Sequence, residues 1–179
     1  MSGMQLDAKS ANDIYKDGRF QACDWTFLGE DEALPAAGPV FVPLEVWRAS
    51  ADALRGRNAP TGVVVEAGED IRALAADIAH VAAVAVRFPK FSDGRGYSTA
   101  RILREELSFT GEIRAIGDVL IDQIALMRRC GFDAFAVTHV PTRASLEGNG
   151  VPDVVLHYQP VESAKEIPAG ARPWMRRQA

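Results

Sequence analysis

The chain has 179 residues, of which 47% are hydrophobic and 25% charged, and its formal net charge is −4. This length and composition are typical of one globular domain whose core is large enough to fold without disulfides or metals. The negative net charge argues against a general nucleic-acid binder, because such proteins depend on a basic surface. A local basic pocket is still compatible with it.

No stretch approaches the roughly 20 apolar residues of a membrane span. The start, Met-Ser-Gly-Met-Gln-Leu-Asp, lacks the charged and apolar regions of a signal peptide. We therefore expect a cytoplasmic protein that binds neither a membrane nor nucleic acid. A reducing cytosol favours free thiols at Cys23 and Cys130, and two cysteines are too few for an iron–sulfur cluster.

The first regular signal along the chain is a β-hairpin. Asp17-Gly18 lies between two short β-prone runs, and an Asp-Gly pair in this position is typical of a tight hairpin turn. We place this N-terminal hairpin in residues 14–28. Residues 30–38 are then expected to form a loop that leads into the main part of the domain.

From Val40 onward, short apolar runs alternate with helical patterns, which predicts repeated β-α units and a mainly parallel sheet of about five strands. The expected strands cover residues 40–42, 62–66, 83–88, 112–116 and 134–138. The expected helices lie near residues 44–55, 70–81, 98–107 and 118–130. The fold class is therefore α/β, and both a doubly wound sheet and a partial β/α barrel satisfy the pattern.

The ends of the helices carry local signals. Ser98 or Thr99 is expected to cap the helix near 98–107, and Asp118 the helix near 118–130. Gly131 follows two arginines and a cysteine, which predicts a glycine at the end of that helix with basic residues in its last turn.

After Val140-Pro141 the regular pattern ends. We expect a single domain over 1–179, with a β-α core at 40–140 and a C-terminal extension at 141–179. The extension includes a candidate edge strand at 154–158.

The loop after the strand at 83–88 is the richest in candidate functional residues. Sites in parallel α/β folds form beyond the carboxyl ends of strands, and this loop leads into a helix, whose first N–H groups and dipole favour an anion. Arginine side chains nearby bind oxyanions through paired hydrogen bonds. The residues expected to bind the anion are Arg87, Lys90, Ser92, Gly94, Arg95, Gly96, Tyr97 and Ser98.

We expect the three basic side chains of this loop to face a common space. The alternative interpretation is structural: Asp93-Gly94 is a simple turn, Ser98 is a helix cap, and the basic residues form a solvated rim.

Three carboxylates near the same strand ends are candidate catalytic groups, namely Glu66, Asp93 and Asp118. Asp118 and Asp122 also lie four residues apart, so both fall on one helix face. For these two, a helix cap and a surface residue are the alternative interpretation. Among the scattered histidines, only His139 lies at a strand end, and no spacing predicts a zinc site, so we expect no metal.

Gly94-Arg-Gly96 resembles the start of a dinucleotide-binding fingerprint. Thr99 stands where that fingerprint needs its third glycine or alanine. No flavin, nicotinamide or cluster motif is present, and we expect no cofactor in the isolated chain.

The segment Phe88-Pro-Lys-Phe-Ser-Asp-Gly-Arg-Gly-Tyr-Ser98 resembles a bacterial family with a formally uncharacterised domain. The likeness continues through Gly111-Glu-Ile-Arg-Ala-Ile-Gly-Asp-Val-Leu120 and Asp122-Gln123 to Met127-Arg-Arg-Cys-Gly-Phe-Asp-Ala-Phe135. Members of this family are described as probable oxidoreductases involved in sulfite reduction, encoded beside assimilatory sulfite reductase. The resemblance implies a role in sulfur assimilation and a possible oxidoreductase activity, with sulfite reductase or another sulfur-assimilation protein as partner.

Three hypotheses follow. The first is an accessory or enzymatic component of assimilatory sulfite reduction that handles a small oxyanion at the loop 88–98. The second is a non-catalytic module that docks on the reductase through an exposed apolar patch, for which Trp47 and Trp174 are candidates. The third is a small-molecule enzyme on a partial β/α barrel, with Lys90, Asp93 and Asp118 in acid/base roles.

Overall fold

A computed structural model describes residues 13–152 of the chain. The bounds of its strands are β1 Asp13–Lys16, β2 Arg19–Ala22, β3 Thr26–Phe27, β4 Val40–Pro43, β5 Thr61–Val65, β6 Ala83–Phe88, β7 Glu112–Gly117 and β8 Ala134–Phe135. The α-helices are α1 Leu44–Arg55, α2 Arg95–Arg101, α3 Ile121–Arg129 and α4 Val140–Asn149. None of the helices in this part of the chain is long and apolar enough to cross a membrane.

The strands form one mostly parallel, curled sheet in the order β2-β1-β8-β7-β6-β5-β4-β3. The five expected strands are all present as neighbouring parallel strands, β4 to β8. The sheet has eight strands rather than about five, because the hairpin and β3 extend it at its two ends. These additions are short, and short runs carry a weak sequence signal.

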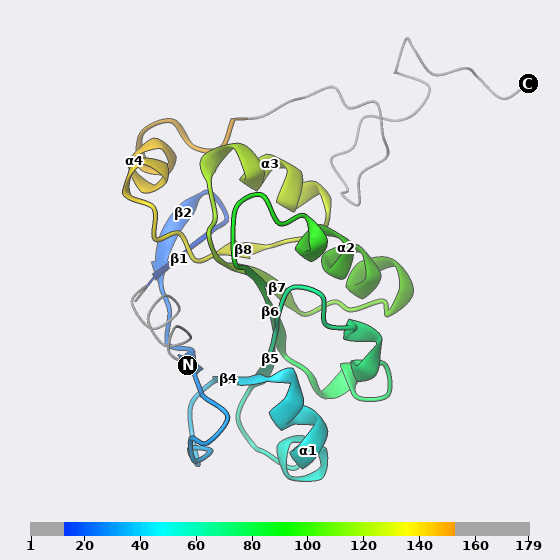
Figure 1. Cartoon of the computed structure of the whole chain (residues 1–179). Coiled ribbons are helices and arrows are strands. Elements are labelled where there is room, and N and C mark those ends of the chain that lie inside the picture. Colours follow the sequence, from blue (N-terminus) through cyan, green and yellow to red (C-terminus); the bar gives the residue numbers. More distant parts are fainter. Residues whose placement is uncertain (1–12, 153–179) are drawn as a thin grey trace, which may run out of the picture.

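The strand order decides between the two expected architectures. In a doubly wound sheet the order reverses at a switch point, whereas here β3 to β8 follow one another without reversal. Parallel crossovers are nearly always right-handed, so a sequential order places all connecting helices on the same face of the sheet. Figure 1 shows α1, α2 and α3 on one side of the curled sheet, which makes the fold a half-barrel.

The hairpin is present, with Asp17 and Gly18 both at positive φ (52° and 82°), as a tight turn with this handedness requires. It is shorter than expected, since it ends at Ala22. Within the expected hairpin region, Thr26–Phe27 forms β3 instead, which pairs with β4 at the opposite end of the sheet.

Three helix expectations need correction. The segment near 70–81 forms two 3-10 helices, Ile71–Leu74 and Ile78–His80, instead of one α-helix. The helix near 98–107 begins earlier, at Arg95, and continues as a π-helix over Ile102–Glu106. The chain after Val140 is regular, because α4 begins there with Pro141 in its first turn, where a missing N–H costs nothing.

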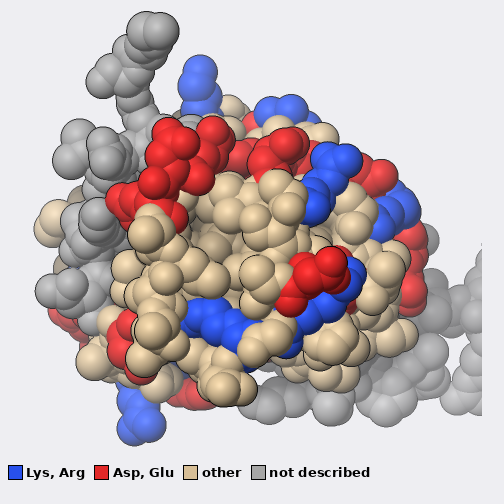
Figure 2. Space-filling model, turned by 90° about the horizontal axis from the view of Figure 1, so that it is seen from below, with Lys and Arg blue, Asp and Glu red and all other residues tan. Residues whose placement is uncertain are grey.

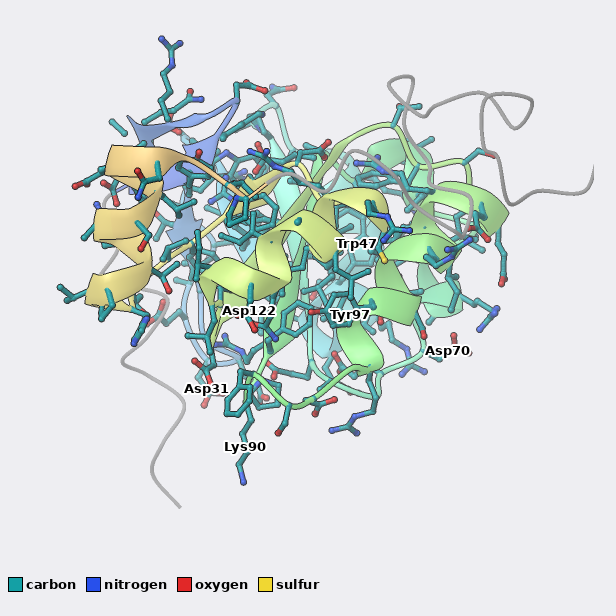
Figure 3. All side chains as sticks on the ribbon, turned by 90° about the horizontal axis from the view of Figure 1, so that it is seen from above. Asp31, Trp47, Asp70, Lys90, Tyr97 and Asp122 are labelled. Atoms are coloured by element: carbon teal, nitrogen blue, oxygen red, sulfur yellow. The ribbon has the colours of Figure 1, made fainter. Side chains whose placement is uncertain are left out.

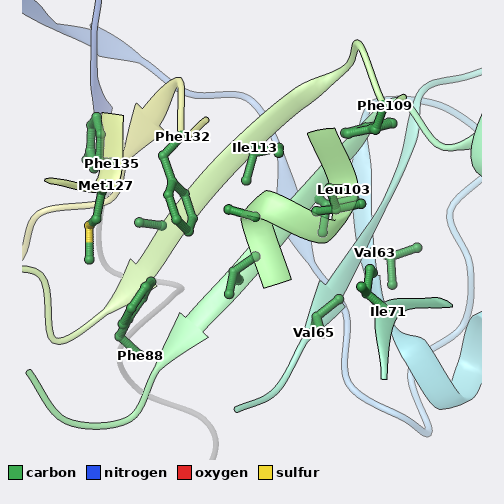
Figure 4. Close-up of a cluster of buried hydrophobic side chains, with 14 of the residues drawn as sticks. Val63, Val65, Ile71, Phe88, Leu103, Phe109, Ile113, Met127, Phe132 and Phe135 are labelled. Atoms are coloured by element: carbon green, nitrogen blue, oxygen red, sulfur yellow. The ribbon is translucent and has the colours of Figure 1, made fainter. Parts of the chain in front are cut away.

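Alternation along the strands divides the core into two layers. Side chains such as Val63 and Phe88 face the helices and pack with Leu103 and Met127, as Figure 4 shows. The next side chains along the strands face the hollow of the half-barrel, where Phe41 lies over Gly62. Both faces of the parallel strands are therefore buried, which explains their continuous apolar runs.

Candidate functional site

The loop after β6 is fixed to the β7–α3 connection and to the first turn of α3 by two hydrogen bonds at Phe91. The Phe91 N–H donates to Asp118 Oδ2 at 2.8 Å, and its carbonyl accepts from Gln123 Nε2 at 2.6 Å. A turn between Lys90 and Asp93, closed by a 3.0 Å backbone bond, shapes the loop just beyond. The loop is therefore held in one position at the carboxyl edge of the parallel strands.

Arg87 and Glu66 meet at this edge. Arg87 lies near the end of β6 and donates from Nε to Glu66 Oε1 at 2.7 Å, just after the end of β5. Adjacent parallel strands bring the two together, although they are 21 residues apart. Arg87, which we expected to bind an anion, therefore already has a carboxylate partner, the half-exposed Glu66.

Arg95 and Asp93 form a second ion pair. Asp93 accepts from the N–H, Nε and Nη2 of Arg95, with the shortest contact at 2.6 Å. The guanidinium and these hydrogen bonds lower the pKa of Asp93 to about 2, so Asp93 is ionised at neutral pH. The Arg95 side chain also lies against Gly68, which has a φ of +98° and whose added Cβ would lie 2.7 Å from Nη1.

The structure brings Arg87 and Arg95 to the same segment, residues 66–68, but it does not bring Lys90 to them. Figure 3 shows Lys90 extending away from the molecule. Ser92, Gly94 and Ser98 are also exposed. The expectation that all three cations face a common space is therefore wrong, because the pinned loop turns Lys90 outward.

The helix after the loop begins at Arg95, and neither expected cap is used. Gly94 is the residue before the helix, and Ser98 lies exposed within it. The backbone of Gly96 is helical, and its missing side chain makes room for Phe88, whose ring would lie 2.6 Å from an added Cβ. Tyr97 packs edge-on against the same ring, with centroids 5.4 Å apart.

Asp118 also differs from its expected role. The residue before α3 is Leu120, and the side chain of Gln123 accepts from its N–H at 3.0 Å. The Asp118 carboxylate instead holds the loop at Phe91, while Asp122 lies exposed on α3. The end of α3 is as expected, with Gly131 at a φ of +104° just beyond it.

Sequence reasoning missed a charged cluster inside the half-barrel. Arg114, whose side chain is 1% exposed, donates to Glu112 at 2.7 Å and to the Cys23 sulfur at 3.1 Å. Lys16 donates to the same Glu112 at 2.7 Å. The signal was available: Arg114 is a charged residue in the middle of an otherwise buried strand.

Arg114 also lies over the Phe41 ring, 5.0 Å from its centroid. Burial by itself raises the pKa of Glu112, but the charge of Arg114 and the hydrogen bonds from Lys16 and Arg114 outweigh it and leave this pKa lowered. The cluster therefore pairs one carboxylate with two cations, a fully buried arginine and a partly exposed lysine.

The remaining candidates are separate from the loop. His139 precedes α4, where its Nδ1 lies 2.9 Å from Thr142 Oγ1. Cys130 is buried, and burial raises the pKa of its thiol. Trp47 is fully buried and donates to Asp77, so it forms no docking patch. Trp174 and the expected strand at 154–158 lie outside the described residues.

Charges of both signs are mixed on the surface. In Figure 2, which looks onto the side where α1 lies in Figure 1, acidic side chains gather along the upper margin, and basic side chains with acidic ones beside them lie below the centre. No continuous basic area covers this face. Within residues 13–152, no group of three or more His, Cys, Asp or Glu is placed to hold a metal ion.

The fold and the loop define a class: a half-barrel α/β protein with its densest set of polar loop residues at the carboxyl edge of the parallel strands. The model of a family of bacterial proteins of unknown function, DUF934, matches residues 62–168. The chain belongs to this family, which agrees with the resemblance seen at the loop 88–98. No curated protein matches the chain.

Proposed function

We propose that the chain is a cytoplasmic accessory component of assimilatory sulfite reduction, and that it handles a small oxyanion such as sulfite between Arg87 and Arg95. The observation that carries the proposal is the position of the two arginines. Both side chains reach residues 66–68 at the carboxyl edge, where ligands of parallel α/β folds bind. The resemblance supplies the pathway and the partner, sulfite reductase.

Each arginine is available to an anion at moderate cost. The Arg95 side chain is 61% exposed, and exposed ion pairs of this kind contribute little to stability. An oxyanion can therefore replace Asp93 as the partner of Arg95, while Arg87, held by Glu66, supplies a second guanidinium nearby. The contribution of the chain is binding, and no electron carrier of its own is needed for that role.

The acid/base alternative has less support. With a pKa of about 2, Asp93 stays ionised and does not serve as a general acid near neutral pH. The Asp118 carboxylate is occupied by the backbone of Phe91. Lys90 extends away from the molecule.

The pathway is tested by growth of a deletion strain on different sulfur sources. We expect slow growth on sulfate and sulfite, and normal growth on sulfide and cysteine. Equal growth on all four sources contradicts a role in sulfite reduction.

The site is tested by calorimetric titration of sulfite, with phosphate as a second anion. Arg95→Ala removes one charge-assisted contact, and the expected loss in affinity is about 10- to 150-fold. Arg48→Ala is the matched control, since Arg48 is an exposed arginine on α1 whose nearest carboxylate contact is a loose 3.8 Å. Absence of sulfite binding at millimolar concentrations rejects the oxyanion site, even if the growth defect is present.

A further inference from the structure

Asp93 fills the hydrogen-bonding fork of Arg95 in the way that an external oxyanion would. The Nε and Nη2 groups of Arg95 donate to the two carboxylate oxygens of Asp93, at 3.0 and 2.6 Å. This paired geometry is typical of a guanidinium group bound to a carboxylate or a phosphate. Within residues 13–152, Asp93 is the one carboxylate that forms an ion pair with Arg95. An external anion and Asp93 therefore compete for the same two N–H groups.

The backbone of the loop helps to keep Asp93 in this position. Asp93 Oδ1 also accepts the backbone N–H of Arg95 at 3.2 Å, and the N–H of Asp93 donates to the Lys90 carbonyl at 3.0 Å. The Asp93 side chain is only 16% exposed, whereas the more exposed Arg95 guanidinium is open to an incoming anion. A carboxylate tethered so close to its partner has an effective concentration of at least about the millimolar range.

Arg87 is held differently from Arg95. It donates to Glu66 through Nε, and within the described part of the chain its Nη1 and Nη2 groups donate to no protein atom. Arg87 can therefore bind an anion through these groups without releasing Glu66. The competition takes place at Arg95, and Asp93 is the competing group.

Charge decides which anions win this competition. Arg87 and Arg95 carry two positive charges, and the carboxylates of Glu66 and Asp93 balance them. An anion with a single charge gains at Arg95 only about as much as the displaced carboxylate loses. An anion with two charges is attracted more strongly to both guanidinium groups, because the Coulomb energy grows with the product of the charges.

We propose that Asp93 is a built-in competitor of the anion site and restricts this site to doubly charged oxyanions. This inference rests on the proposed oxyanion site between Arg87 and Arg95. Sulfite, sulfate and hydrogen phosphate belong to the accepted class, whereas sulfonates and other singly charged anions do not. The Arg95 guanidinium lowers the pKa of Asp93 to about 2, so the competing carboxylate is ionised throughout the neutral pH range.

The experiment is calorimetric titration of the full chain with sulfate and with methanesulfonate, a sulfur oxyanion that carries one charge less. Wild type is expected to bind sulfate, and to leave methanesulfonate unbound up to about 10 mM. Asp93→Asn removes the competing charge but keeps an oxygen that accepts the Arg95 N–H. This variant should bind sulfate about three- to tenfold more tightly, since no exposed ion pair has to be broken. Its binding of methanesulfonate should become measurable.

Asp70→Asn is the matched control. Asp70 precedes Arg72 by two residues and accepts its backbone N–H at 3.1 Å and its Nη1 at 3.5 Å, an arrangement similar to that of Asp93 and Arg95. The fork of Arg72 is bound to Glu106 instead, through Nε and Nη2. The affinity of the Asp70→Asn variant for sulfate should stay within about twofold of that of wild type.

A second measurement reports on Asp93 itself. NMR titration of its carboxyl carbon should give a pKa of about 2 in the free protein. Saturating sulfate takes over the Arg95 guanidinium, so this pKa should rise toward the ordinary value of 3.8. Sulfate that binds elsewhere on the chain leaves the pKa of Asp93 unchanged, and that result contradicts the competition.

The outcomes separate this inference from the proposed function. Equal affinity of wild type and Asp93→Asn for sulfate overturns the competition, although the oxyanion site stands. Methanesulfonate binding by wild type as tight as that of sulfate overturns the restriction to double charge. Binding by Asp93→Asn but not by wild type supports Asp93 as the competing group and rejects the oxyanion as the natural ligand. Absence of binding by both proteins overturns both proposals.

Discussion

Gly96→Val tests whether this glycine serves packing rather than anion binding. An added Cβ would lie 2.6, 2.9 and 3.1 Å from three atoms of the buried Phe88 ring. Contacts this short force the ring to move, and it is already packed against Phe132 and Tyr97. Overpacking of this kind costs about 1–3 kcal/mol, while the gain in helix propensity from glycine to valine returns only a few tenths. We expect a net loss of stability of about 1–3 kcal/mol.

The measurement is urea unfolding of wild type and variant, with the slope of the transition checked for constancy. Gly94→Val is the control, because an added Cβ there meets nothing within 4 Å, and its cost should stay near that of a weaker helix cap. Phe88→Leu removes the ring, so combining it with Gly96→Val should cost less than the sum of the two single changes. Equal effects at Gly94 and Gly96, or strict additivity with Phe88→Leu, would refute the packing argument.

Two further predictions concern the ion pairs. Arg114→Ala removes the buried guanidinium that binds Glu112, while Lys16 still pairs with that carboxylate, and chemical denaturation should show a loss of about 1.5–3 kcal/mol. Arg95→Gln should return the pKa of Asp93 from about 2 toward 3.8, measured by NMR titration of its carboxyl carbon. Because the folded-state pKa is depressed, the stability from this pair is present above the ordinary value and lost as the pH falls toward 2. An Asp93 that titrates identically in wild type and variant would show that the pair is absent in solution.

The parts of the fold that the sequence predicted correctly are those with a strong local pattern. The buried strands β5 and β6 were visible as continuous apolar runs, and the hairpin turn was visible as Asp17-Gly18. The segment 70–81 has a helical pattern, yet it folds into two short 3-10 turns. Local helix propensity is a weak signal that tertiary contacts often override, so the pattern did not distinguish an α-helix from two 3-10 turns.

The candidate loop shows the same limit. The sequence shows the glycines and the charged residues of this loop, but it does not show which residue pairs with each charge. Glu66 pairs with Arg87 only because β5 and β6 are neighbours, and Asp118 holds Phe91 only because β7 lies beside β6. From the sequence we expected Asp118 to cap a helix, because an aspartate just before a helix commonly binds the first N–H groups of that helix. Its actual partner, Phe91, is 27 residues away in the chain.

The sequence by itself determined the α/β class, the five central strands, the hairpin turn and the family, because each depends on residues close together in the chain. The tertiary structure alone decided the half-barrel, since strand order depends on contacts between distant segments. It also decided which cations are paired and which is free: Arg87 and Arg95 have carboxylate partners, and Lys90 faces solvent. The physical reason is that charge pairing depends on distance in space, which strand neighbours and pinned loops set.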